Sequence, residues 1–382
     1  MRPSPELHAK LLRFEPQVEV LRRGEQLVRR IGMVGSDGQV YRFFLQYSLP
    51  YWTRSDERTS QMFFVLDKLL ANDVRASRAH LSVQPHAVIP VAQRLRLVRE
   101  PKSRVSLEEV YDKSLPRDAD NQEFARRFNV SLRKRISQRL REAGDEPNVG
   151  VIEDEARIEV YRETAMAAKV PSRLLVDHME KRLSSPEALF QFRRTFSNQW
   201  AASCLLQYVF ATPDRNPGRV VIMEDSGRVI SPDCRTSYNN HGVLETYRLP
   251  FRLSTNLASL IGFPLVDATF GPAMAMISSA VADAKEDMFP VLCLLMRDDL
   301  LAYSTKTVAK SDSKTQESER QMTDFVLKNV ATIQSRFDEC KPVLKVASAP
   351  GPLPDAKVRN LIEEAQKEEN LSSMLGQFQG WV

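Results

Sequence analysis

The chain has 382 residues and a formal net charge of +5, with 42% hydrophobic and 27% charged residues. These values are ordinary for a soluble globular protein with a sizeable core. No apolar run approaches the roughly 18 residues that suggest a membrane span, and residues 1–14 lack the apolar core of a secretory signal, so we expect an intracellular protein. The four cysteines and five histidines are dispersed without metal-ligand spacing, which argues against a zinc site built by the protein.

The first hundred residues favour β-strands with a single helix. Residues 31–34 and 40–47 are β-rich and flank a Ser-Asp-Gly turn, a combination that predicts a hairpin. Residues 56–72 have the broad apolar face of a helix. Residues 88–98 predict a further strand pair, with a proline at its bend or edge.

Helical patterns dominate the rest of the chain. We expect helices over residues 106–113, 121–141, 159–164, 171–182, 185–210, from about 256, 288–304 and 319–336, with a short hairpin at 216–230. Strands first and helices afterwards indicate a bilobal α+β protein. The polar residues 305–318 have no apolar period and predict a mobile loop.

The densest basic stretch lies within residues 133–141, in a predicted helix that ends near Gly144. One interpretation is a solvated helix face or a mobile insert, and the other is nuclear targeting or nucleic-acid contact. No aromatic residues interleave with these charges, so a stacking platform for single strands is not supported.

Several motifs occur in the order typical of phosphatidylinositol-3-kinase-related kinases. Residues 31–43 resemble the first hairpin of that family, and residues 249–254, Leu-Pro-Phe-Arg-Leu-Ser, resemble the motif that closes its activation segment. Residues 361–365, 369–371 and 380–381 resemble the FATC tail that ends these proteins. The resemblance covers about residues 20–382 and implies a bilobal kinase-like fold with a C-terminal FATC helix.

This resemblance implies a small lobe over residues 1–99, a large lobe over 100–340, a linker over 341–357 and the FATC tail over 358–382. We expect the tail to pack on the large lobe. Its structural or interaction residues are Leu361, Ile362, Asn370, Leu371 and Trp381.

The phosphate-binding position is altered relative to active members of the family. Phosphoryl transfer needs a lysine on the phosphates, metal ligands and an aspartate that orients the nucleophile. Gln46 stands where the resemblance places the lysine, and no lysine occurs between Lys10 and Lys68. We therefore expect Asp56 and Glu57, at the start of the following helix, to lack their usual cationic partner.

The catalytic loop is also altered. Asp214 corresponds to the aspartate of active relatives, but Asn216 replaces a histidine and Arg219 replaces the metal-binding asparagine. A guanidinium is always charged and cannot coordinate a cation. The resemblance therefore implies a weakened metal site.

The metal-binding Asp-Phe-Gly motif corresponds to Asp233, Cys234 and Arg235. We expect Arg219 or Arg235 to pair with Asp233 or Asp214, so that a fixed cation replaces the metal ion. The alternative is that both arginines point to solvent.

Together these changes resemble the TRRAP-type pseudokinase branch. That resemblance implies a catalytically inactive scaffold of a histone acetyltransferase and transcription coactivator complex such as SAGA. It also implies a nuclear location, no cofactor, and as partners the protein subunits of the complex and transcription activators, without membrane contact. Direct nucleic-acid contact stays open, and a large helical solenoid is expected if the chain is a fragment.

Three other interpretations remain. An active serine/threonine kinase of the same family would need a replacement lysine. A lipid kinase shares the fold but does not explain the FATC-like tail. A pseudokinase that still binds ATP as a structural ligand is opposed by Gln46 and Arg219, which weaken the phosphate and metal contacts.

Overall fold

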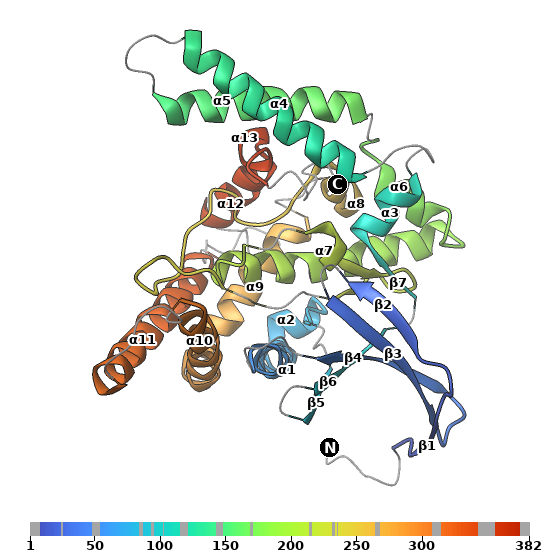
Figure 1. The fold of residues 1–382 in the computed structure, drawn as a ribbon. Helices are drawn as coiled ribbons and strands as arrows, with labels where there is room; N and C mark the ends of the chain where they lie inside the picture. Colours follow the sequence, from blue (N-terminus) through green and yellow to red (C-terminus); the bar gives the residue numbers. More distant parts are fainter. Residues whose placement is uncertain are drawn as a thin grey trace, which may run out of the picture.

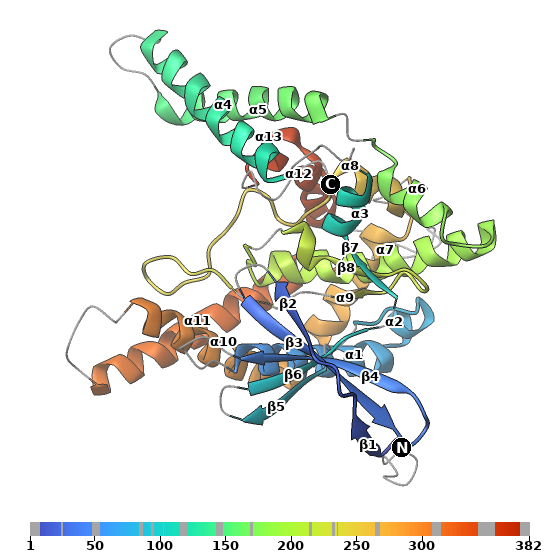
Figure 2. The same cartoon turned by 45° about the vertical axis from the view of Figure 1, so that its right-hand side comes forward.

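The computed structural model describes residues 8–23, 26–47, 54–83, 87–92, 95–101, 103–114, 121–142, 148–168, 171–213, 216–230, 234, 236–263, 268–307, 315–342 and 356–374. A twisted sheet forms one end of the molecule and helices form the rest, with a helical hairpin projecting from the opposite end (Figures 1 and 2). None of the helices in these ranges is both long and apolar enough to cross a membrane.

The sheet is antiparallel and has the strand order β1-β3-β4-β6-β5, with β2 also paired to β3. Its strands are β1 (Leu11–Phe14), β2 (Glu19–Arg23), β3 (Gln26–Gly35), β4 (Val40–Tyr47), β5 (Val88–Ala92) and β6 (Leu95–Arg99). The predicted hairpin is β3–β4, and Gly38 in its turn has φ 75°, a conformation that favours glycine. The two strands preceding this hairpin were not predicted.

The helices are α1 (Ser55–Asn72), α2 (Val74–Arg78), α3 (Leu107–Ser114), α4 (Asn121–Glu142), α5 (Val149–Ala168), α6 (Leu174–Glu180), α7 (Pro186–Val209), α8 (Thr255–Ile261), α9 (Phe270–Asp283), α10 (Lys285–Thr307), α11 (Thr315–Glu339), α12 (Ala356–Gln366) and α13 (Glu368–Leu371). A second small sheet joins β7 (Arg104–Ser106), β8 (Val221–Met223) and β9 (Val229–Ile230), and a 3-10 turn, η2 (Pro217–Arg219), precedes β8.

Two segment boundaries in the structure differ from those predicted from the sequence. The loop expected over residues 305–318 is helical at both ends, because α10 continues to Thr307 and α11 begins at Thr315; residues 308–314 lie outside the described part. Backbone hydrogen bonds extend a helix once it is nucleated, so polar terminal turns need no apolar period. The tail helix α12 likewise begins at Ala356, inside the expected linker.

The main core surrounds α7, whose apolar residues recur every fourth position. Phe192, Phe196 and Trp200 stack along one face, with ring centroids 6.4 and 6.2 Å apart, and each is at most 2% exposed. Residues four apart share a helix face, so this spacing buries all three rings together. Burying such side chains contributes roughly 1.5–3 kcal/mol each.

Helix α1 belongs to this main core rather than to the sheet. Its residues Met62, Phe63, Leu66 and Leu70 are at most 1% exposed and lie in the same apolar cluster as α7 and α9. The sheet has its own small cluster, Val28, Phe44 and Val98. The helix of the small lobe is thus held by the large one.

The C-terminal helices α12 and α13 lie between the α4–α5 hairpin and α9 (Figure 1). Val358, Leu361, Ile362 and Ala365 occupy one face of α12 and are at most 7% exposed. Leu371 of α13 is 4% exposed. The C-terminal residues 375–382, which include Trp381, lie outside the described part.

A side-chain amide joins the two tail helices. Asn370 Nδ2 donates to the backbone oxygen and to Oε2 of Glu364, each at 2.8 Å, and Asn370 is 7% exposed. A buried amide must find such partners because an unsatisfied one costs about 1–3 kcal/mol.

Candidate functional site

Gln46 lies near the end of β4, directly opposite Arg96 of β6. Cross-strand partners share a face of a sheet, and so do residues two apart in a strand. Phe44, Gln46, Arg96 and Val98 therefore share one face. An uncharged amide here can donate a hydrogen bond but cannot neutralise phosphate charge.

Arg96 supplies a cation to this face from the neighbouring strand. Its Nη1 lies 2.5 Å from Oδ2 of Asp56 at the start of α1, and the two side chains are 14% and 17% exposed. Asp56 thus has a cationic partner on β6 that was not predicted, in place of the usual lysine on β4. The linear sequence did not indicate this pair because it depends on the register between β4 and β6.

A second ionic cluster covers Phe44 on the same face. Glu100 Oε1 accepts from Arg30 Nη2 at 2.7 Å and from Arg104 Nε at 3.3 Å. The two guanidinium carbons lie 5.7 and 5.4 Å from the Phe44 ring centroid, and Phe44 is 1% exposed. Arg30 and Arg104 thus lie over the Phe44 ring, and Glu100 holds both of them there. Sequence reasoning missed all three charged residues, since none lies in a motif.

The loop corresponding to the catalytic loop is held by its own polar groups. The Asn216 side chain accepts from the backbone N–H of Gly218 at 2.8 Å and so caps η2. A Cβ at position 218 would overlap the carboxylate of Glu108 in α3, so the loop and α3 are in close contact. Burial, together with Asp112 and Glu109, raises the pKa of Glu108. Arg219 is exposed at the end of the turn.

Cys234 is buried, 4% exposed, and forms no disulfide. Asp214, Asp233 and Arg235 lie outside the described residues, so the expected arginine–aspartate pair remains a prediction. Within the described part, no group of three or more His, Cys, Asp or Glu residues could hold a metal ion.

The segment after Cys234 is tied to both α1 and α10 by a buried carboxylate. Asp299 accepts from the hydroxyls of Ser55 at 3.2 Å, of Tyr238 at 2.9 Å, and of Thr236. Burial raises the pKa of Asp299, and the hydroxyl donors act against it by stabilising the carboxylate. One residue along, Asp298 Oδ2 accepts from Arg58 Nε at 2.8 Å. These contacts hold the start of α1 against the end of α10.

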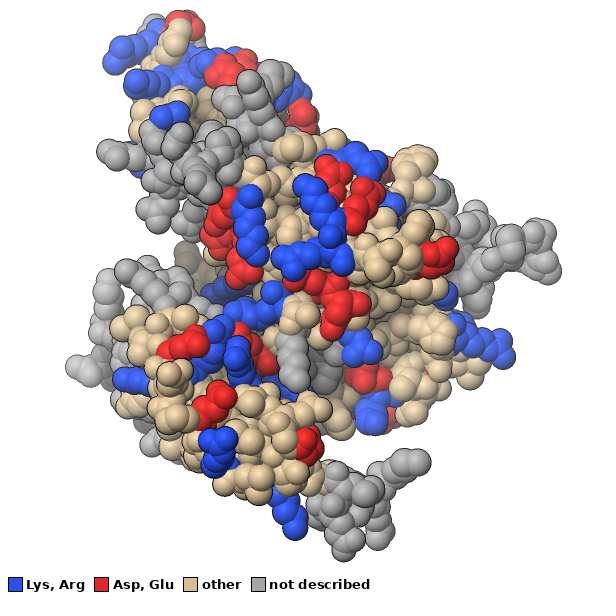
Figure 3. Space-filling model, turned by 90° about the vertical axis from the view of Figure 1, so that its right-hand side faces the viewer, with Lys and Arg blue, Asp and Glu red and all other residues tan. Residues whose placement is uncertain are grey.

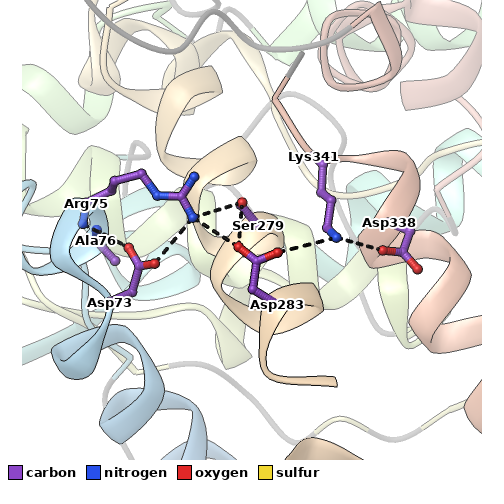
Figure 4. Close-up of polar contacts among 7 residues, drawn as sticks. All are labelled: Asp73, Arg75, Ala76, Ser279, Asp283, Asp338 and Lys341. Atoms are coloured by element: carbon purple, nitrogen blue, oxygen red, sulfur yellow. Dashed lines mark hydrogen bonds and ion pairs between the residues drawn. The ribbon is translucent and has the colours of Figure 1, made fainter. Parts of the chain in front are cut away.

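A chain of ion pairs holds α2 to the large lobe (Figure 4). Arg75 Nη2 lies 3.3 Å from Asp73 Oδ2, 3.0 Å from Ser279 Oγ and 3.1 Å from Asp283 Oδ2. Lys341 Nζ continues the chain, 3.5 Å from Asp283 Oδ1. The network thereby connects the small lobe, α9 and the end of α11.

The predicted basic stretch lies on α4 in the projecting hairpin, where side chains of both signs mix at the top of the molecule (Figure 3). Arg135 Nη1 lies 2.9 Å from Glu159, and Arg139 lies 2.6 Å from Glu155 of α5. These interhelical pairs neutralise part of the stretch, while Arg133 stays exposed. The hairpin itself is longer than predicted, because α5 begins at Val149.

The family model for phosphatidylinositol 3- and 4-kinase matches residues 46–305, which is more than half of the chain. The chain belongs to the phosphatidylinositol 3- and 4-kinase family. The bilobal kinase-like fold predicted from the sequence is confirmed by this match and by solved structures of that fold.

Among curated proteins, the chain is 26% identical over 338 residues to a SAGA and NuA4 acetyltransferase complex subunit, Tra1 of Schizosaccharomyces pombe, covering 84% of this chain and 9% of that protein. It is 23% identical over 399 residues to the human transformation/transcription domain-associated protein, an alignment that covers 100% of this chain and 10% of that protein. The predicted resemblance to the TRRAP-type branch is thus confirmed. This chain spans about a tenth of the length of these relatives.

Among solved structures, the open conformation of CtTel1 superposes with a TM-score of 0.69 at 16% identity, covering 100% of this chain and 13% of that chain. The FAT and kinase domain of CtTel1 gives the same TM-score, with 25% of that chain covered. At this identity the likeness concerns the fold alone.

Proposed function

We propose that this chain is a catalytically inactive, kinase-like scaffold in a nuclear histone acetyltransferase and transcription coactivator complex. The observation that carries the proposal is the arrangement of charge around Gln46. The residue where a lysine is expected is neutral, and the neighbouring cation, Arg96, is engaged by Asp56 at 2.5 Å.

The neighbouring ionic cluster supports the same conclusion. A nucleotide needs open space beneath the small-lobe sheet and cations for its phosphates. Phe44 on this face is 1% exposed, and Arg30 and Arg104 are both bound to Glu100. Replacing these contacts by a nucleotide would cost the protein two charge-assisted hydrogen bonds.

The assembly part of the proposal rests on the relatives. Two curated relatives are subunits of the SAGA and NuA4 acetyltransferase complexes. Histone acetyltransferase subunits and transcription activators are accordingly the partner class that we propose for this chain.

The first test is thermal unfolding of the 382-residue chain with and without millimolar ATP and magnesium. We expect no shift of the melting temperature. A magnesium-dependent shift that is lost in Asp233→Ala would contradict the proposal, favour an ATP-binding pseudokinase or an active serine/threonine kinase, and call for phosphotransfer assays.

The second test concerns assembly. The tagged chain is purified from nuclear extract and assayed for acetyl transfer to histones. We expect acetyltransferase activity to co-purify with it. Its absence, with the chain itself folded and recovered, would refute the assembly part and leave the catalytic part intact.

A further inference from the structure

The described part of the chain contains a cavity of about 570 Å³ in the seam between α1, α10 and the start of β5. Its apolar wall comes from Phe64 and Val65 of α1, Val291 and Leu294 of α10, and Ala87. We call this feature the α1–α10 groove.

The apolar wall of the groove is exposed rather than sealed. Phe64 is 54% exposed and Leu294 is 42% exposed. On β5, the strand that follows Ala87, Ile89 is 46% and Val91 is 55% exposed. Large apolar side chains that gather around one cavity mark an interaction site more often than scattered exposed residues do.

The geometry of the groove suits a helix. Helices α1 and α10 run antiparallel, because Arg58 pairs with Asp298 at one end while Val65 and Val291 meet in the cavity wall further along. A seam between two such helices presents ridges into which a third helix can pack. An added strand is disfavoured, because Pro90 in β5 has no N–H to donate.

The two ends of the apolar wall differ in charge. At one end Arg58 lines the groove, and its guanidinium is already paired with Asp298 at 2.8 Å. At the other end, Lys68 Nζ lies 5.6 Å from the Phe64 ring centroid, with no ion pair to a carboxylate in the described part of the chain. The charge that a partner could neutralise therefore lies at the Lys68 end of the groove.

We propose that the α1–α10 groove binds an amphipathic helix of a partner protein. The apolar face of this helix covers Phe64 and Leu294, and an acidic side chain at one end of that face lies against Lys68. The inference rests on the proposed scaffold role, for which it supplies a docking surface. Direct binding tests it, so its failure would leave the assembly proposal standing.

The probe is a displayed library of amphipathic helical peptides of about 16 residues, random in charge, selected on the immobilised 382-residue chain. We expect enriched peptides to carry Asp or Glu at one end of an apolar face. Enrichment of basic peptides, or no enrichment at all, would overturn the proposal.

Substitutions in the apolar wall test whether the selected peptides bind at the α1–α10 groove. The double variant Phe64→Ser and Leu294→Ser should weaken the selected peptides by about tenfold or more, as expected for loss of interface anchors. The matched control, Phe190→Ser, alters a side chain of α7 that is 63% exposed and should leave binding unchanged. Equal affinity for the double variant and the wild type would overturn the assignment.

Charge reversal provides the sharper readout. Lys68→Glu should reverse the preference, so that a peptide with lysine at the facing position binds more tightly than its glutamate counterpart. Because Lys68 is exposed, the change should leave the melting temperature near that of the wild type. An unchanged preference would refute the charge argument. A concentration-dependent dimer that the double variant abolishes would instead make the occupant a second copy of this chain and overturn the partner assignment.

Discussion

Replacing Arg96 with glutamine removes the guanidinium that pairs with Asp56. The pair is 2.5 Å long and its side chains are 14% and 17% exposed, so it lies between a surface pair and a buried one. Exposed pairs contribute about 0.2–1 kcal/mol, and breaking a buried pair costs about 3–5 kcal/mol. We therefore expect Arg96→Gln to lower the free energy of unfolding by about 2 kcal/mol.

The assay is urea unfolding followed by circular dichroism, with Arg99→Gln as the control. Arg99 lies on the same strand three positions away, hence on the opposite face, and its guanidinium contacts only the Tyr41 ring among the described interactions, at 5.9 Å. An exposed contact of this kind contributes about 0.5–1 kcal/mol.

A rescue variant tests the register. In Arg96→Gln with Gln46→Lys, the new ammonium projects from the same face toward Asp56 and should restore about 1 kcal/mol of the loss, as for other cross-strand exchanges. If Arg96→Gln is no more destabilising than Arg99→Gln, the ion pair contributes nothing. If the double variant is no more stable than Arg96→Gln, the placement of residue 46 beside Asp56 is refuted.

Three further predictions concern stability. Ile362→Ala should lower the free energy of unfolding by about 2–5 kcal/mol, because Ile362 is 1% exposed in the main core. Glu363→Ala, on the exposed side of α12, should change it by less than about 0.5 kcal/mol. Equal values for the two variants in urea unfolding would contradict the packing of the tail. Burial raises the pKa of Asp299, so the folded state binds its proton more tightly than the unfolded state. The wild type should therefore lose stability relative to Asp299→Asn as pH rises above about 4. A difference in unfolding free energy between the two proteins that is flat from about pH 4 to 7 would contradict this. Arg75→Gln should lower the free energy of unfolding by less than about 1 kcal/mol, because the Arg75 side chain is 44% exposed. This loss should vanish near 1 M salt, where charges are screened within about 3 Å. A loss that persists at that salt concentration would show that the network stabilises the fold by packing.

Local patterns in the sequence predicted those elements that need only neighbours in the chain. The β3–β4 hairpin follows from two β-rich runs around a turn, and α1 follows from its apolar face. The tail helix α12 follows from apolar residues three and four apart. The change expected at Gln46 removes a positive charge and the change expected at Arg219 adds one. Both are predicted from the sequence, because they fall in motifs of fixed order.

Contacts between distant segments were decided only by the tertiary structure. Arg96 meets Asp56 because strand register places β6 beside β4, and Arg30 reaches Glu100 across 70 positions of the chain. Apolar periodicity indicates that α1 buries a face but not which lobe receives it, and packing assigned that face to the large lobe. Sequence alone thus determined the family and most of the order of elements, and the altered motif positions stay predictions made from it. Which charges meet, and which apolar surfaces stay open, depends on distances that exist only after folding.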